Sequence, residues 1–244
     1  MNRRWVTGRR AVAEAVRAGL AEEVVVGTWV RTTPGLRDVL RSAEKAGVRI
    51  REAPRSTLDG IGPDHQGVAA RMAAARELSE GELAHHDFGP EDVVVVLDGI
   101  TDPQNLGAAA RTAEAAGAAM LITRIRRAAA VTPAAVRASA GALSHLPVAR
   151  VTNLRRSVET LKDRRFTVIG LDGAGSSIYD EPCPEGLVAL VVGAEDAGIS
   201  RLVREGCDLL VALPMGGRVG SLNASAALAA ALYGYVLPTR NRVR

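Results

Sequence analysis

The stretch Pro214–Ser225, with the sequence PMGGRVGSLNAS, decides how this chain folds, because a glycine-rich loop there runs directly into an uncharged, alanine-rich helix. Its three glycines allow backbone amides to approach a ligand closely. Ser221 and Asn223 add small polar side chains where the helix is expected to begin and where amide groups lack partners inside the helix. The stretch predicts a binding site built mainly from backbone.

Composition indicates a globular intracellular protein. The chain has 244 residues and is 47% hydrophobic, which is enough for one large domain or two smaller ones. The longest nearly uncharged run, 224–237, is shorter than the roughly 18 to 20 residues of a bilayer span, and residues 2–5 lack the apolar core of a signal peptide. Cys183 and Cys207 form neither a disulfide framework nor a zinc motif. We expect a cytoplasmic protein without membrane contact or bound metal.

Charge favours a polyanionic partner. The net charge is +4 and the isoelectric point is about 9.6. Nearly all the positive charge is arginine, because only Lys45 and Lys162 are lysines, and the planar guanidinium suits phosphate contact and base stacking. A GC-rich genome would enrich arginine, alanine and glycine in the same way, so charge alone supports nucleic acid only weakly.

Hydrophobic periodicity divides the chain into two α/β parts joined by a polar segment. We expect a small domain at 1–75, a linker at 76–91, a larger domain at 92–237 and a basic tail at 238–244. The small domain is expected to contain helices at 8–20, 36–46 and 55–59, and strands at 23–30, 48–52 and 67–72. The larger one is expected to contain strands at 93–97, 119–123, 147–151, 166–171, 187–192 and 208–213, and helices at 105–116, 133–141, 154–163, 200–205 and 222–237. Continuous valine and leucine strands alternating with helices predict a mostly parallel sheet with helices on both faces.

Three glycine-rich loops follow strands of the larger domain, at 172–175, 193–198 and 214–220. The carboxyl ends of parallel strands share one edge, so these loops are expected to line one crevice. No glycine precedes Lys-Ser or Lys-Thr, which disfavours a kinase or GTPase. A Rossmann oxidoreductase is also a poor fit, since the glycine pair at 173 and 175 lacks a third glycine and prolines follow at 182 and 184. The remaining expectation is an adenosine-like ligand without a phosphate chain.

Three segments carry a family resemblance. They are DGITDPQNLGAAART at 98–112, LVVGAEDAGI at 190–199 and the stretch from Leu213 to Ser225. Together they resemble the three motifs of the SpoU (TrmH-like) branch of the SPOUT methyltransferases, in the same order and at comparable spacing. TGRRAV at 7–12 and HQGV at 65–68 are similar to the ribosomal-protein-like domain with which this family binds its RNA substrate. Within the family, the chain looks most like the RlmB type, which methylates guanosine in 23S rRNA.

The resemblance implies methylation of an RNA ribose 2'-hydroxyl with S-adenosylmethionine as cofactor. The catalytic residues that it implies are Asn105, Arg111, Glu195, Ser221 and Asn223; the expected cofactor contacts are Gly173, Gly193, Leu213, Met215 and Leu222. Each polar residue also has a structural alternative: Asn105, Ser221 and Asn223 suit helix caps or first turns, Glu195 a cap, and Arg111 a solvated helix position. For Arg111 we favour phosphate positioning over proton abstraction, because guanidinium stays protonated below pH about 12.

RNA contacts are expected at Arg9 and His65 in the small domain and at Arg124 and Arg126 after a strand of the large one. Each of these residues could equally be structural. The resemblance further implies a trefoil-knotted catalytic domain and a homodimer. A tRNA 2'-O-methyltransferase, a self-protecting resistance methylase and a noncatalytic RNA-binding or ribosome-assembly protein of the same fold remain alternatives, with a dinucleotide enzyme a distant fourth.

Overall fold

The structure is a computed structural model that describes residues 5–72, 77–178, 180, 182–218 and 220–240. Val219 of the glycine-rich stretch and residues 241–244 of the expected basic tail lie outside the described residues. The chain divides into two compact units, Met1–Ala74 and Ala75–Arg244. Among the described residues, no helix is long and apolar enough to cross a membrane.

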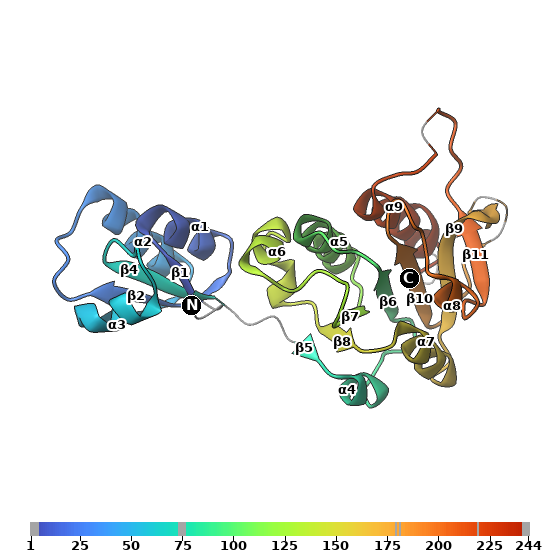
Figure 1. The fold of residues 1–244 in the computed structure, drawn as a ribbon, viewed down its shortest axis with the longest axis horizontal. Coiled ribbons are helices and arrows are strands. Elements are labelled where there is room, and N and C mark those ends of the chain that lie inside the picture. Colours follow the sequence, from blue (N-terminus) through green and yellow to red (C-terminus); the bar gives the residue numbers. More distant parts are fainter. Residues whose placement is uncertain (1–4, 73–76, 179, 181, 219, 241–244) are drawn as a thin grey trace. The chain divides into compact units, whose positions relative to one another are not determined.

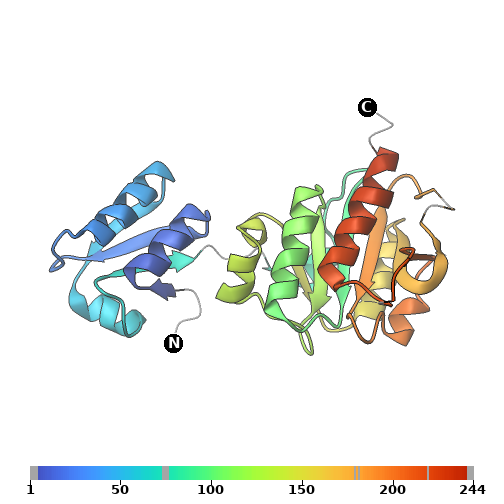
Figure 2. The same ribbon diagram turned by 90° about the horizontal axis from the view of Figure 1, so that it is seen from above.

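The N-terminal unit contains a four-stranded sheet with helices on both faces (Figures 1 and 2). Its strand order is β1-β4-β2-β3, and β2 pairs antiparallel with β4 and parallel with β3. Valines of β2 alternate between two cores: Val24 and Val26 pack with α1 and α2, whereas Val25 packs with α3. The bounds are β1 Trp5–Thr7, α1 Arg9–Arg17, β2 Ala21–Gly27, α2 Pro34–Lys45, β3 Arg49–Ala53, α3 Arg55–Ile61 and β4 Val68–Met72.

The C-terminal unit has a seven-stranded sheet in the order β11-β9-β10-β6-β7-β8-β5, and every strand pair in it is parallel. All six residues of β6 and of β10 are buried, as expected for strands covered on both faces. The predicted mostly parallel sheet is therefore confirmed. The strands are β5 Glu77–Leu78, β6 Val93–Asp98, β7 Met120–Arg124, β8 Val148–Val151, β9 Thr167–Ser177, β10 Val188–Gly193 and β11 Leu209–Ala212.

Helices cover both faces of this sheet (Figure 1). Helices α5, α6 and α9 pack together on one face, and α4, α7 and α8 lie on the other. Their bounds are α4 Glu80–Ala84, α5 Pro103–Ala115, α6 Pro133–Ala138, α7 Leu154–Asp163, α8 Arg201–Arg204 and α9 Ala224–Ala231, which continues as a π-helical turn at Leu232–Val236 and as α10 Leu237–Arg240. Although α9 follows the edge strand β11 in sequence, it packs against α5 and β10 near the middle of the sheet.

The segment 76–91 differs from its prediction as a linker. It contains β5, which adds a parallel edge strand beside β8, and α4, which begins with a capping box between Ser79 and Glu82. Glu80 also accepts hydrogen bonds from the backbone amides of Thr152 and Asn153. Elements this short do not produce a hydrophobic period, which is why the sequence pattern missed them.

Three further boundaries differ from the sequence expectations. β9 continues to Ser177, and its residues 171–175 form a wide bulge, since Leu210 of β11 faces Gly170 and Val211 faces Ser176. The segment 172–175 is thus a bulge within a strand and not a loop after one. The last helix begins at Ala224 and not at Leu222, and Asn223 is its N-cap. Arg240, expected in a loose tail, donates hydrogen bonds to the carbonyl oxygens of Glu91 and Gly186.

Candidate active site

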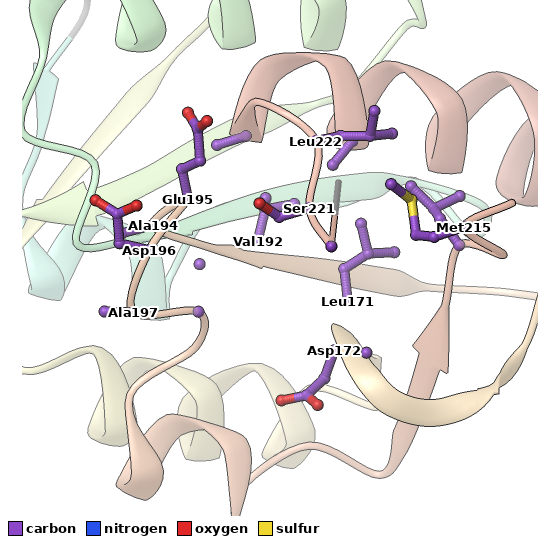
Figure 3. A pocket seen from close by; sticks show the side chains of 17 residues that line it. Leu171, Asp172, Val192, Ala194, Glu195, Asp196, Ala197, Met215, Ser221 and Leu222 are labelled. Carbon is purple, nitrogen blue, oxygen red and sulfur yellow. The ribbon is translucent and has the colours of Figure 1, made fainter. Parts of the chain in front are cut away.

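A cavity of about 360 Å³ opens where β10 and β11 end, beside the bulge of β9. Ligand sites of parallel α/β sheets lie at this edge, and the volume falls within the range of small-molecule pockets, about 300 to 1,000 Å³. Figure 3 shows Glu195 and Asp196 at one end of the cavity, Leu171, Leu222 and Met215 at the other, and Ser221 between them. All three predicted glycine-rich segments contribute to its lining, as do the five residues expected to contact the cofactor: Gly173, Gly193, Leu213, Met215 and Leu222.

The turn that carries Glu195 is held by close backbone packing. Ala194 and Gly198 exchange two backbone hydrogen bonds of 3.2 and 2.7 Å, which close the turn. A Cβ atom on Gly193 would lie 2.0 Å from the carbonyl carbon of Gly198, so no other residue fits there without moving the turn. Gly198 itself has a φ of +63°, in the left-handed region that favours glycine. These glycines therefore fix the position of Glu195 at the cavity.

The opposite end of the cavity is apolar and accessible. Met215 and Leu222 keep 40% and 41% of their surface exposed, although both are large hydrophobic residues. Exposed apolar side chains that line a hollow are typical of a ligand surface. Among the described residues, the lining contains no lysine, arginine or histidine. Of its three acidic residues, Asp172 is paired with Arg204 at 2.8 Å, whereas Glu195 and Asp196 have no recorded cationic partner in the described chain. The cavity therefore suits a ligand with an apolar body and a positive charge.

A polar cluster adjoins this cavity and is centred on Asn223. Its amide nitrogen Nδ2 donates to Asn105 Oδ1 at 3.0 Å and to Glu195 Oε2 at 3.4 Å. Its Oδ1 accepts from the Ser225 amide at 3.0 Å and from the Ser225 hydroxyl at 2.7 Å. These four bonds use both donors of the amide and set its orientation. Asn105, Glu195 and Asn223, which are far apart in sequence, thus meet in one place.

Local structure explains how each member of the cluster is positioned. Asp102, and not Asn105, caps α5 by accepting from the Gln104 amide at 3.0 Å, and Pro103 occupies the first helical position. Asn105 therefore lies in the first turn of α5 with its side chain available to Asn223. Ser225, which we did not predict as a site residue, holds the Asn223 side chain; it is visible in the sequence only as a second small polar residue at the start of the helix.

The other two predicted catalytic residues lie apart from this cluster. Ser221 is exposed and lines the cavity, two residues before the N-cap of α9, but it makes no hydrogen bond to Asn105, Glu195 or Asn223 in the described part of the chain. Arg111 is exposed on α5, and the structure records no hydrogen bond or ion pair from it to any described residue. Its guanidinium is thus accessible to a partner from outside the chain.

A buried ion pair lies beneath the same edge of the sheet. Asp98, at the end of β6, has a side chain that is only 3% exposed, and its Oδ1 lies 3.0 Å from Arg124 at the end of β7. Its Oδ2 accepts from the Ser200 amide at 2.8 Å, and Arg124 also donates to the Ser200 hydroxyl at 3.2 Å. Asp98 and Arg124 together hold the segment that leads out of the Glu195 turn. The sequence offered one signal for Asp98, a carboxylate at the end of a buried strand.

This pairing changes the interpretation of Arg124, which the sequence suggested as an RNA contact. Arg9 differs from Arg124, because it donates through Nε to the Gln66 carbonyl at 3.2 Å and through Nη1 to the Thr33 hydroxyl at 2.8 Å, while Nη2 has no recorded bond to the described residues. Of the four predicted RNA contacts, Arg126 alone is exposed without a recorded hydrogen bond or ion pair to the described residues.

His65, the fourth residue of that group, is held from both ring nitrogens. Nδ1 accepts a hydrogen bond from the Gly67 amide at 2.9 Å, so the proton of the neutral ring is on Nε2, which donates to Asp59 Oδ1 at 3.0 Å. The histidine therefore shapes its loop.

The fold disfavours the thiolate form of both cysteines. Both are free thiols, and burial raises the pKa of each from 9.0 to about 11. Asp208 adds to the effect at Cys207, whereas Lys162 opposes it there and Arg240 opposes it at Cys183. Among the residues that the structure describes, no group of three or more histidine, cysteine, aspartate or glutamate side chains is arranged to hold a metal ion.

Two family models match the chain, in the order of the two units. The one described as the SpoU rRNA Methylase family matches residues 92–233, and the one described as RNA 2'-O ribose methyltransferase substrate binding matches residues 5–78. The chain belongs to the SpoU rRNA methylase family. It is therefore an RNA methyltransferase, and the resemblance of its three motifs to the SpoU branch is confirmed.

Relatives of this SpoU methylase match over nearly its whole length. A Bacillus subtilis protein assigned to the TrmH family of tRNA/rRNA methyltransferases is 38% identical, covering 94% of this chain and 93% of its own. An uncharacterized tRNA/rRNA methyltransferase of Mycobacterium leprae is 40% identical, covering 93% of this chain and 75% of its own.

Two solved structures are similar to this chain in fold. The SpoU methyltransferase AviRb from Streptomyces viridochromogenes, in complex with the cofactor AdoMet, has a TM-score of 0.69 and 29% identity over 98% of this chain and 90% of its own. A structure concerned with the 2-OH methylation of C/U34 on tRNA has a TM-score of 0.55 and 28% identity over 63% of this chain and 100% of its own.

Proposed function

We propose that this SpoU methylase uses S-adenosylmethionine to methylate the ribose 2'-hydroxyl of a guanosine in 23S rRNA. The observation that carries the proposal is the junction between the cavity and the polar cluster: Glu195 lines the cavity and also accepts a hydrogen bond from Asn223. A cofactor site and a set of oriented polar groups thereby adjoin, which is the arrangement that methyl transfer to a hydroxyl requires.

The cavity fits S-adenosylmethionine in its chemistry. This cofactor supplies a methyl group on a positively charged sulfonium, joined to an apolar adenine and lacking any phosphate. Glu195 and Asp196, which have no recorded cationic partner among the described residues, favour the positive charge, and the exposed Met215 and Leu222 offer apolar surface. Gly193 and Gly198 allow the tight turn that places the backbone of residues 194–197 along the cavity. The complex of AviRb with AdoMet supports the same assignment by family relation.

Asn105, Glu195 and Asn223 are the residues that we propose to orient the ribose. Two asparagine amides and a carboxylate can donate to and accept from a hydroxyl, and their mutual hydrogen bonds restrict their rotamers before RNA arrives. Ser221 extends this polar surface along the cavity. Arg111 is accessible and without a recorded partner in the described chain, and we propose that it binds the phosphate next to the reacting ribose.

Several features support ribosomal RNA in a cytosolic homodimer. The match of residues 5–78 to a substrate-binding family model favours a large structured RNA, and the two free cysteines suit the cytosol.

An apolar stripe is exposed on α9 and its continuation, at Ala226, Ala230 and Tyr233, which supports pairing with a second copy. The return of α9 from the edge strand β11 to the centre of the sheet supports a trefoil knot. A tRNA substrate is the second candidate, favoured by the related structure that concerns tRNA.

The test is nucleoside mass spectrometry of rRNA and tRNA from a strain that lacks this protein. We expect one 2'-O-methylguanosine to disappear from 23S rRNA and to return when purified protein and S-adenosylmethionine are added to the unmodified RNA. If a ribose methyl group of tRNA disappears and returns instead, tRNA is the substrate, as in the second candidate. Retention of every 2'-O-methyl site in the deletion strain, together with no restoration in vitro, would overturn both.

A further inference from the structure

The N-terminal unit contains a hollow of its own, about 380 Å³ in volume. Trp29, His65 and Gln66 line it together with Arg9, Arg55 and Asp64. All of these residues belong to the N-terminal unit, so the hollow is complete within it.

Trp29 forms an aromatic platform in this hollow. The side chain is 39% exposed, which is unusual for the largest apolar residue type in a unit with a developed core. Its six-membered ring lies over Gly27, where a Cβ atom would come within 2.4 Å of the ring carbons. The rings of Trp29 and His65 pack edge to face, with an interplanar angle of 87° and 6.1 Å between their centroids. Backbone and a second aromatic group thus support the tryptophan ring, and its exposed part borders the hollow.

The loop that carries His65 has an unusual backbone conformation. Asp64, Gln66 and Gly67 have φ angles of +59°, +49° and +78°, in the left-handed region that non-glycine residues rarely adopt. The hydrogen bonds of His65 to Asp59 and Gly67 hold this conformation. Strained backbone persists where the surroundings enforce it, and it concentrates at binding sites.

Cationic groups border the platform. Arg9 is fixed by the Gln66 carbonyl and the Thr33 hydroxyl, so its guanidinium is held in place at the hollow. Arg55 is 72% exposed and lies 3.9 Å from Asp59, a loose ion pair in water. Asp64 contributes one negative charge, so two arginines and one aspartate line the hollow. An aromatic face beside arginines is the combination that holds an unstacked base and its phosphate in single-stranded RNA.

We propose that this hollow binds one splayed-out nucleotide of the RNA substrate, with the base stacked on Trp29 and its phosphate at Arg9 and Arg55. The proposal rests on the RNA methyltransferase function, and it specifies which residues hold one nucleotide within the unit that matches the substrate-binding model. The Gln66 side chain, whose Oε1 lies 3.4 Å from the Arg9 amide, lines the same hollow and is available to the edge of the base.

Tryptophan fluorescence provides a direct test, because the chain has only two tryptophans. In the Trp5→Phe variant Trp29 is the single reporter, and we expect a short single-stranded RNA to quench it to saturation. A ribose-phosphate strand of the same length without bases should leave the emission nearly unchanged. Equal quenching by both strands, or none by either, would overturn stacking on Trp29.

Affinity measurements test the same contact by substitution in the full-length protein. Trp29→Ala should weaken RNA binding at fixed salt by about 5-fold to 150-fold, the range expected for loss of one base–aromatic stack. Trp29→Phe should recover most of the affinity. Gly27→Ala provides a second variant that keeps the tryptophan, since the added methyl group displaces its ring, and it should reduce the quenching. Unchanged RNA affinity in both Trp29→Ala and Gly27→Ala would contradict the proposal.

Calorimetric titration of S-adenosylmethionine separates this proposal from the function on which it rests. The cofactor cavity is lined only by residues of the C-terminal unit, so Trp29→Ala should bind the cofactor like the parent protein. A protein that methylates RNA but binds it equally well without Trp29 would overturn the platform and leave the methyltransferase function intact. A protein whose Trp29 is quenched by RNA but that transfers no methyl group would leave the platform intact and overturn the proposed reaction.

Discussion

Replacing Asp98 by asparagine should destabilise the C-terminal unit, because this carboxylate is buried and satisfies two partners at once. The asparagine oxygen can still accept from the Ser200 amide, but its NH2 group then faces the guanidinium of Arg124, donor against donor. Breaking a fully buried pair costs about 3 to 5 kcal/mol. Arg124 is 29% exposed and keeps its bond to the Ser200 hydroxyl, so we expect Asp98→Asn to lower the free energy of unfolding by about 2 to 3 kcal/mol.

Scanning calorimetry of the full chain measures this effect. For a unit of this size each kcal/mol corresponds to roughly 2 to 4 °C, so the melting temperature of the C-terminal unit should fall by about 4 to 12 °C. Arg126→Gln, two residues from Arg124 and exposed, is the matched control and should change stability by less than about 0.5 kcal/mol. The reasoning would be refuted if Asp98→Asn matched the control, or if Arg124→Gln weakened RNA binding while leaving the melting temperature unchanged.

Three further predictions concern the cavity, the polar cluster and the thiols. Gly193→Ala should lower the affinity for S-adenosylmethionine, measured by calorimetry, more than about tenfold, because its methyl group would lie 2.0 Å from the Gly198 backbone. Gly216 has open space around it, so the affinity of Gly216→Ala should stay within about threefold of the parent protein, and equal effects of the two changes would be inconsistent with the tight turn. Asn223→Asp keeps the cap of α9 but replaces an amide donor by a carboxylate beside Glu195. Single-turnover methyl transfer should therefore slow about 100-fold while cofactor affinity stays within about threefold, and parallel losses of rate and affinity would argue against a role on the ribose side. Burial raises the pKa of Cys183 and Cys207 to about 11, above the unfolded value of 9.0, so the contribution of the protonated thiols to stability is complete below pH 9 and is lost as the pH rises through 11. Native protein at pH 8 should therefore react with a thiol reagent far more slowly than urea-unfolded protein, and comparable rates would show that the thiols are accessible.

The sequence predicted the location of the cavity better than the partners of its side chains. The rule that parallel strands end at one edge predicts from sequence alone that the segments at 172–175, 193–198 and 214–220 lie together. All three line the cavity. Buried strands such as β6 were visible as continuous valine runs, so the parallel sheet followed as well.

Side-chain partners depend on distances between elements, which the sequence does not contain. Arg124 looked like a free cation in a basic cluster, yet β6 and β7 are neighbours and bring it to Asp98. Asn105 and Asp102 are both good N-cap residues, and only the structure shows that Asp102 begins α5 and leaves Asn105 to Asn223. The bulge at 171–175 was missed because it is defined by its pairing with β11.

The most direct test of ribose methylation is mass spectrometry of nucleosides after incubating purified protein with S-adenosylmethionine that carries a deuterated methyl group. The substrate is 23S rRNA from the deletion strain, with tRNA from the same strain in parallel and the Asn223→Asp variant as the matched catalytic control. We predict one labelled 2'-O-methylguanosine in 23S rRNA, formed about 100-fold more slowly by the variant. Label on a nucleobase, or no label in either RNA, would contradict a ribose 2'-O-methyltransferase.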